Sequence, residues 1–445
     1  MILRSRNIVT PQGIQPATIH VNGRVIERIG ELDDVPEGAP VDDFGELTLI
    51  PGLVDSHVHV NEPGRTEWEG FETATRAAAA GGVTTIVDMP LNSIPPTTSV
   101  AALEAKVRAI EGKCRVDVAL WGGAVPGNAG QLRAMLDAGA CGFKCFLVDS
   151  GVPEFGHLEP HGLEEALNAL RGTGAPLLVH AELPEHLYAP AGDDRSYASY
   201  LATRPVEAED EAIALVYALA RKTGTHAHIV HLSSANGLDA LRRARAAHVP
   251  LTAETTPHYL YFTAERVPDG ATEFKCAPPI RGHANREALW RGLEEGLLSA
   301  VVSDHSPCTP ELKRMDEGDI AHAWGGIASL QFGLPIVWTE AKKRGIAFET
   351  IVSLMTTGPA TLAGLGDRKG RLEAGYDADI VVIDPEARFV VRTEHVEHRH
   401  KVTPYAGETL TGVVKATYVR GHKVWQDGLH LGNAIGEWVT RAKDA

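Results

Sequence analysis

Eight short apolar runs, separated by long Ala-rich segments of helical periodicity, constrain the fold of this 445-residue chain most strongly. Alternation of buried strands with helices is typical of parallel β/α folds, and eight such units predict a TIM (β/α)8 barrel. The runs are 53–57, 83–88, 116–121, 142–147, 176–180, 228–231, 251–254 and 300–304. An open, doubly wound sheet is the alternative, but no G-x-G-x-x-G loop follows an early run, which favours the barrel.

Both ends of the chain contain short β-branched segments instead. Segments 17–21 and 24–29 flank Asn22-Gly23, a typical hairpin turn dipeptide. Three later segments are also predicted strands, punctuated by Asp384-Pro385 and Arg420-Gly421: 379–383, 389–392 and 417–424. Because an isolated hairpin is barely stable, we expect the two ends to complete one small β-sandwich-like domain. The predicted division is residues 1–50 and 366–445 for this β domain, and 51–365 for the barrel.

Charge and cysteine usage exclude several classes of protein. The 42 basic against 58 acidic residues give a formal charge of −16, which disfavours nucleic-acid binding. The five cysteines include no C-x-x-C pair, so we expect reduced thiols and no disulfide framework or zinc knuckle. Without a run of about 18 apolar residues or a signal-peptide pattern, we expect no membrane association and a cytoplasmic location.

Polar side chains gather where the apolar runs end, the edge of a TIM barrel that carries active sites. They are His57, His59, Lys144, His180, His231 and Asp304. Singly, each has a simpler explanation: a hydrogen-bonded histidine, a surface lysine, an aspartate that caps a helix. Six of them at the same edge of five predicted strands favour a site for zinc or a similar divalent ion, which imidazole and carboxylate bind well.

Several motifs together resemble the amidohydrolase superfamily, in its cyclic-amide hydrolase branch and there most closely the allantoinase family. They are Gly-Leu-Val-Asp-Ser-His-Val-His at 52–59, the segment 61–71, Asp-Met-Pro-Leu-Asn-Ser at 88–93, Gly-Phe-Lys at 142–144, Pro-Pro-Ile-Arg at 278–281, Ser-Asp-His-Ser-Pro at 303–307, and 375–381. The resemblance runs through nearly the whole chain and implies a hydrolase that opens a cyclic amide.

The resemblance implies a binuclear centre bridged by a carboxylated Lys144 and a hydroxide. His57 and His59 would bind the more buried ion, with Asp304 completing its shell, and His180 and His231 the more exposed one. Two dications lower the pKa of a bound water, to roughly 7 for a single zinc. Asp304 would be the catalytic residue that transfers the proton of the attacking hydroxide to the leaving ring nitrogen. Zinc is the expected metal, with cobalt, manganese and iron as alternatives.

The predicted reaction is the ring opening of allantoin to allantoate. Dihydroorotases of this branch carry an arginine where this chain has Asn61, and commonly an asparagine where Cys276-Ala277 stands, so dihydroorotate is a weaker candidate. A hydantoinase or dihydropyrimidinase is the main alternative. The candidate substrate contacts are Asn92, Cys276, Ser306, Gly325, Gly326 and Arg65. Arg65 contacts the ureide or braces its own loop through Glu67 or Glu69.

Other interpretations give clear tests. A non-catalytic relative of the dihydropyrimidinase type would lack metal ligands, and none is missing here. A mononuclear deaminase would bind about one ion per chain instead of two.

The histidines at 395, 398 and 400 are predicted to form a solvated surface loop. The resemblance also suggests a homo-oligomer, commonly a tetramer.

Overall fold

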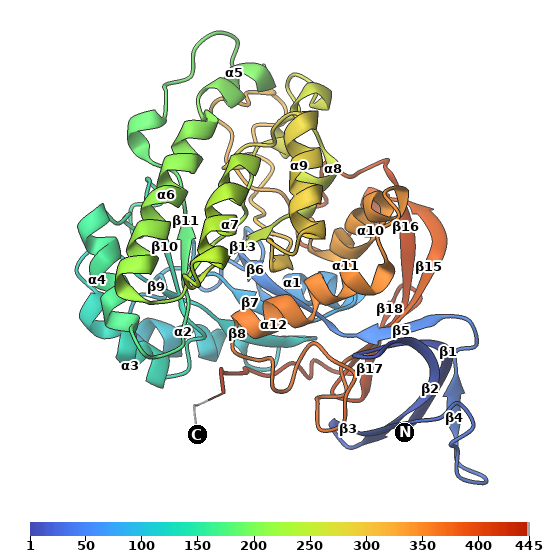
Figure 1. Cartoon of the computed structure of the whole chain (residues 1–445). Coiled ribbons are helices and arrows are strands. Elements are labelled where there is room, and N and C mark those ends of the chain that lie inside the picture. Colours follow the sequence, from blue (N-terminus) through green and yellow to red (C-terminus); the bar gives the residue numbers. More distant parts are fainter. Residues whose placement is uncertain (443–445) are drawn as a thin grey trace.

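A barrel of parallel strands forms the centre of the computed structural model, which describes residues 1–442 (Figure 1). Its strands are β6 (Leu53–Val58), β7 (Val83–Asp88), β8 (Asp117–Leu120) continued by β9 (Gly122–Gly123), β10 (Phe143–Phe146), β11 (Leu177–His180), β12 (Ala227–Ile229), β13 (Leu251–Thr255) and β14 (Ala300–Val301). Each predicted apolar run overlaps one of these strands. The predicted TIM barrel is therefore confirmed over the open sheet.

The ring of strands closes through short parallel contacts. Strands β6, β7 and β8 pair in that order, and β9 to β14 pair in the order of the sequence. The chain runs directly from β8 into β9, and a parallel bridge joins Val58 to His305, just after β14. Because all strands run in the same direction, their carboxyl ends meet at one edge of the barrel.

Helices cover the outside of the barrel (Figure 1). They are α1 (Phe71–Ala80), α2 (Val100–Ile110), α3 (Leu132–Asp137), α4 (Pro160–Leu170), α6 (Val206–Thr223), α7 (Leu238–Ala246), α9 (His283–Glu294), α10 (Gly333–Lys343), α11 (Phe348–Met355) and α12 (Thr357–Leu362). Two short helices, α5 (Tyr197–Ala202) and α8 (Pro257–Tyr261), lie within loops. In α1 the small side chains of Ala74, Ala77 and Ala78 are fully buried, which allows close helix packing. Within residues 1–442, no helix is both long enough and apolar enough to cross a membrane.

The two ends of the chain share one nine-stranded sheet beside the barrel (Figure 1). Its strands are β1 (Ile2–Thr10), β2 (Gly13–Asn22), β3 (Val25–Gly30), β4 (Val41–Asp43), β5 (Thr48–Pro51), β15 (Ile380–Val390), β16 (Thr409–Val419), β17 (His422–Gln426) and β18 (Leu429–His430). Strand β5 pairs with β1 on one side and with β15 on the other. The expectation that the ends complete each other's sheet is confirmed, whereas the exact division at residues 50 and 366 stays a prediction.

Two local predictions were wrong, one for the position of a turn and one for the end of a strand. Asn22 pairs with Val25, so Gly23 and Arg24 make the two-residue turn, one position later than predicted. Gly23 alone takes the positive φ that the turn requires, +58°. The predicted break at Asp384-Pro385 is instead an irregularity inside β15, where the pairing register shifts. A bulge tolerates proline because its nitrogen need not donate to the ladder.

Candidate active site

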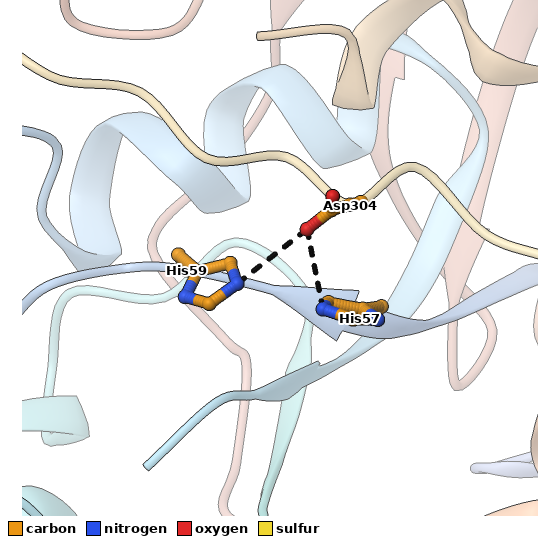
Figure 2. A group of neighbouring side chains, drawn as sticks. All are labelled: His57, His59 and Asp304. Carbon is orange, nitrogen blue, oxygen red and sulfur yellow. Dashed lines mark ion pairs between the residues drawn. The ribbon is translucent and has the colours of Figure 1, made fainter. Parts of the chain in front are cut away.

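His57, His59 and Asp304 meet at the carboxyl edge of the barrel. His57 lies on β6 and His59 directly follows it, so the strand's two-residue period points both imidazoles to the same side. Asp304 follows β14 in a left-handed conformation, with φ of +47°. Its Oδ1 lies 3.2 Å from His57 Nε2 and 3.5 Å from His59 Nε2 (Figure 2). All three side chains are buried, an arrangement that suits a cation.

His180 and His231 form a second pair beside this group. His180 ends β11, and His231 follows β12 by two residues. His180 Nδ1 lies 3.1 Å from His231 Nε2, and the ring centroids of His57 and His231 are 5.3 Å apart. Phe146 stacks on His180 at 4.6 Å. Two adjoining groups of potential ligands therefore share one floor.

Lys144 lies on β10 and is 1% exposed, which excludes a surface lysine. Its Nζ lies 4.7 Å from the centroid of the Phe146 ring and has no hydrogen-bond partner among residues 1–442. Burial lowers the pKa of the Lys144 amine to about 8, although the Asp304 carboxylate partly opposes this shift. A buried, unpartnered amine is expensive to leave charged, so this position suits a modified lysine.

The protonation states of the first group suit metal binding. Burial would raise the pKa of Asp304, but the neighbouring imidazoles of His57, His231 and His59 lower it overall, so the side chain is a carboxylate. Burial lowers the pKa of His59 to about 4 despite the Asp304 carboxylate. Metal ligands must be neutral imidazoles and ionised carboxylates, and the His59 and Asp304 side chains have that form near pH 7.

Two buried glutamates that the sequence reasoning did not single out contact these histidines. Glu254, the penultimate residue of β13, has Oε1 2.6 Å from His57 Nδ1. Glu182 has Oε2 2.7 Å from His180 Nε2. Burial disfavours both charges, but the neighbouring Arg204 and His180 for Glu182, and the adjacent histidines for Glu254, lower each pKa to about 2. The acidic residue at the end of the seventh run and the His-x-Glu spacing after the fifth were the available signals.

The four histidines, Lys144 and Asp304 line a cavity of about 410 Å³. The predicted site residues that line it are His57, His59, Asn92, Lys144, His180, His231, Cys276, Asp304, Ser306, Gly325 and Gly326. Asn92 Oδ1 is buried and has no hydrogen-bond partner in the described chain, so it can accept from a ligand N–H. The Gly326 N–H already donates to the Lys275 carbonyl, and the Gly326 carbonyl accepts from Lys313. Gly326 therefore has less backbone capacity for substrate than predicted.

Arg65 is not among the residues that line the cavity. Its Nη1 donates to the Asn92 carbonyl at 2.9 Å and to the Glu154 carboxylate. Its guanidinium also lies 5.3 Å from the centroid of the Trp68 ring. These contacts brace the loop that carries Asn92. The carboxylate partner of Arg65 is Glu154, where the sequence suggested Glu67 or Glu69.

The walls of the cavity come from loops whose contribution the sequence did not reveal. Tyr188 and Arg204 lie on the segment before α6, and Lys275 and Trp324 on two later loops. The prediction of a solvated histidine loop at 395–400 was wrong for His398, which is fully buried with its ring centroid 5.2 Å from that of His305. Long-range packing against His305 buries this imidazole.

A second carboxylate group lies at the opposite end of the barrel. Asp117, Asp377 and Asp379 place ligand oxygens within 4.8 Å of one another. Lys369 Nζ occupies the middle of this group, 2.7 Å from both Asp117 Oδ2 and Asp379 Oδ2 and 2.9 Å from Asp377 Oδ2. The ammonium already occupies the space between these oxygens, so the group is an ion-pair network and not a metal site.

The fold and this site together define a class. Residues 48–424 match the amidohydrolase family, and the chain belongs to that family. It is 50% identical over 430 residues to an allantoinase of Streptomyces avermitilis, covering 96% of each chain. It is 44% identical over 443 residues to an allantoinase of Saccharomyces cerevisiae, covering 95% of each. Among solved structures, an L-hydantoinase (dihydropyrimidinase) from Arthrobacter aurescens is 32% identical, with a TM-score of 0.93 over 99% of both chains.

Proposed function

We propose that this chain hydrolyses allantoin to allantoate by opening its hydantoin ring. The observation that carries the proposal is the convergence of four imidazoles, a carboxylate and a buried lysine on the floor of one cavity. The similarity to bacterial and yeast allantoinases supports allantoin as the substrate.

The residues fit a centre of two divalent ions. His57, His59 and Asp304 would hold one ion, which we call the first ion site, and His180 and His231 the other, the second ion site. The unpartnered Lys144 Nζ supports a bridging role, because nothing among residues 1–442 accepts its hydrogens. When bound, the ions polarise the substrate carbonyl and lower the pKa of the attacking water. We propose zinc, with cobalt, manganese and iron as metals that also suit nitrogen and oxygen ligands.

Lys144 would act as a carbamate. Its lowered pKa leaves a substantial fraction of uncharged amine near pH 8. The amine lone pair attacks carbon dioxide, an N–C bond forms, and one nitrogen proton leaves to solvent. The product is an anion with two oxygens, which two cations stabilise far better than they tolerate an ammonium.

Asp304 would move the proton during ring opening. Its carboxylate is ionised and lines the cavity, so it can accept the proton of the attacking hydroxide. The same oxygen then delivers that proton to the ring nitrogen as the C–N bond breaks. The nitrogen leaves as a neutral amide nitrogen of the ureide product, and the carbonyl carbon becomes a carboxylate.

The cavity matches a polar, uncharged ring. Asn92 Oδ1 offers an acceptor for a substrate N–H, and Ser306, Gly325 and Cys276 line the same space. The Cys276 carbonyl already accepts a hydrogen bond from the Tyr200 hydroxyl. We therefore propose that Cys276 shapes the cavity and that Asn92 binds the substrate. Asn61, at the position of the dihydroorotase arginine, is fully buried and donates to the Pro307 carbonyl at 3.3 Å.

A substrate panel tests this function. Allantoin, hydantoin, dihydrouracil and dihydroorotate are assayed in parallel after reconstitution with zinc and bicarbonate. We expect allantoin to be the preferred substrate. Turnover of dihydrouracil or hydantoin without turnover of allantoin would favour the second candidate, which the hydantoinase-like structure supports. Absence of all four activities in protein with two ions per chain would refute cyclic-amide hydrolysis.

We further propose a homotetramer located in the cytoplasm. The five cysteines are buried and unpaired, which suits a reducing compartment. Size-exclusion chromatography with light scattering measures the assembly directly, and a monomeric mass would refute the tetramer.

A further inference from the structure

Of the four histidines in the proposed centre, two have one ring nitrogen in contact with a buried glutamate. Glu254 contacts His57 and Glu182 contacts His180, and both glutamates are 0% exposed. The Nδ1 atoms of His59 and His231 have no hydrogen-bond partner among residues 1–442. Each ion site therefore contains one carboxylate-oriented histidine and one histidine without such a partner.

The two glutamates select opposite ring nitrogens. A carboxylate accepts a hydrogen bond, so the imidazole nitrogen beside it carries the hydrogen and the other nitrogen keeps its lone pair. His57 donates from Nδ1, which leaves Nε2 free, and this atom faces Asp304 at 3.2 Å. His180 donates from Nε2, which leaves Nδ1 free, and this atom faces His231 Nε2 at 3.1 Å. In both cases the free nitrogen points at the other ligands of the same ion site.

The two glutamates are themselves held in different ways. Glu182 Oε2 also accepts from Arg204 Nη1 at 2.6 Å, so a cation on the cavity wall fixes its position. Glu254 Oε2 instead contacts His228 Nε2 at 3.1 Å, and His228 Nδ1 contacts Thr252 Oγ1 at 2.7 Å. Because the two supports share no residue, each carboxylate can be perturbed separately.

We propose that Glu182 and Glu254 are positioning residues that each fix the ligand nitrogen of one ion site. Glu182, held by Arg204, presents His180 Nδ1 to the second ion site, and Glu254 presents His57 Nε2 to the first. The inference rests on the two-ion centre of the proposed function. It predicts that loss of either carboxylate weakens one ion selectively, and a different ion in each case.

The test measures metal retention in the zinc-loaded full-length protein. Wild type, Glu182→Gln and Glu254→Gln are titrated with a chelator, and zinc per chain is measured at each step. Partners of ligating histidines typically contribute about 10- to 100-fold to metal affinity, so we expect each variant to release one ion at a roughly 10-fold or more lower chelator concentration. Anomalous diffraction from the zinc then identifies the depleted site, which we expect to be the second for Glu182→Gln and the first for Glu254→Gln.

Two further variants make the result specific. Glu340→Gln is the matched control, because Glu340 is a buried carboxylate that pairs with Arg344 on the outer helix α10 and does not line the cavity. It should retain both ions like wild type. Arg204→Met removes the anchor of Glu182 without removing its carboxylate, and it should weaken only the second ion site, even if Glu182→Gln fails to fold.

The outcomes separate the inference from the function on which it rests. Wild-type protein that never holds two ions would refute the two-ion centre, and the positioning role with it. Wild type with two ions, together with glutamate variants that retain both as well as the control does, would overturn only the positioning role. Loss of the same ion in both glutamate variants would also overturn it.

Discussion

Replacing Lys369 with methionine tests the buried ion-pair network between the barrel and the β domain. Lys369 is fully buried, with three aspartate oxygens within 2.9 Å of its ammonium. Two arginines complete the balance: Arg420 pairs with Asp117, and Arg368 Nη2 lies 2.7 Å from Asp377 Oδ2. Methionine keeps most of the side-chain volume but removes the charge. Three carboxylates then face two cations.

Removing one partner of a buried ion pair costs about 3–5 kcal/mol, because a desolvated charge is left uncompensated. We therefore expect Lys369→Met to lower the free energy of unfolding by about 3–5 kcal/mol. Guanidinium denaturation, followed by circular dichroism, measures this loss. Lys342→Met is the control, since Lys342 pairs with Glu386 at the surface, where an ion pair contributes about 0–1 kcal/mol.

A rescue experiment checks the cause of the loss. Lys369→Ala leaves space among three carboxylates whose ligand oxygens lie within 4.8 Å, an arrangement that calcium can bind. Millimolar calcium should restore part of the stability of Lys369→Ala and none of that of Lys342→Met. Equal denaturation midpoints for Lys369→Met and Lys342→Met would refute the reasoning. Turnover per folded molecule should not change, because Asp117 begins β8 at the end of the barrel opposite the site.

Three further predictions concern the site and its surroundings. Asp304→Asn should retain most zinc, measured by metal analysis, but lose at least about 100-fold in kcat, as expected for loss of a proton-transfer group; a near wild-type rate would remove Asp304 from that role. Lys144→Ala should bind fewer than two ions per chain even with added bicarbonate, and full metal content would exclude the bridging carbamate. Burial raises the pKa of Glu209 from 4.5 to about 7, against the opposing Arg281 guanidinium. The folded chain then holds a proton that the unfolded chain loses, so stability should fall as pH rises from about 4.5 to 7, by about 3 kcal/mol. Urea unfolding curves at pH 5 and pH 8 measure this difference in the free energy of unfolding. Glu209→Gln should reduce the difference, and an unchanged difference would exclude Glu209 as its source.

The barrel strands were predictable because strands buried on both faces appear in the sequence as continuous apolar runs. The position of the site followed from the same logic, since polar residues at the ends of parallel strands must share one edge. His57 and Asp304 are 247 positions apart, yet the strand pattern alone predicts that they meet.

The parts that sequence reasoning missed depend on contacts between distant loops. Arg204 reaches Glu182 across an insertion whose conformation no periodicity describes. His398 lies in a polar segment typical of solvent exposure, but packing against His305 buries it. Pro385 predicted a strand end, whereas pairing on both sides of the irregularity carries β15 past it. In each case a neighbour far away in the sequence overrides the local signal.

The position of β5 in the shared sheet has a consequence for biosynthesis. Residues 48–51 leave the ribosome before the barrel is made, but the strand that covers their open edge, β15, spans residues 380–390 and is made after it. The nascent polypeptide must therefore carry an uncovered β-strand edge while the whole barrel is being made, and such edges invite pairing with other chains. Premature termination before residue 380 would leave that edge permanently open, so truncated products should aggregate even when their barrel is complete.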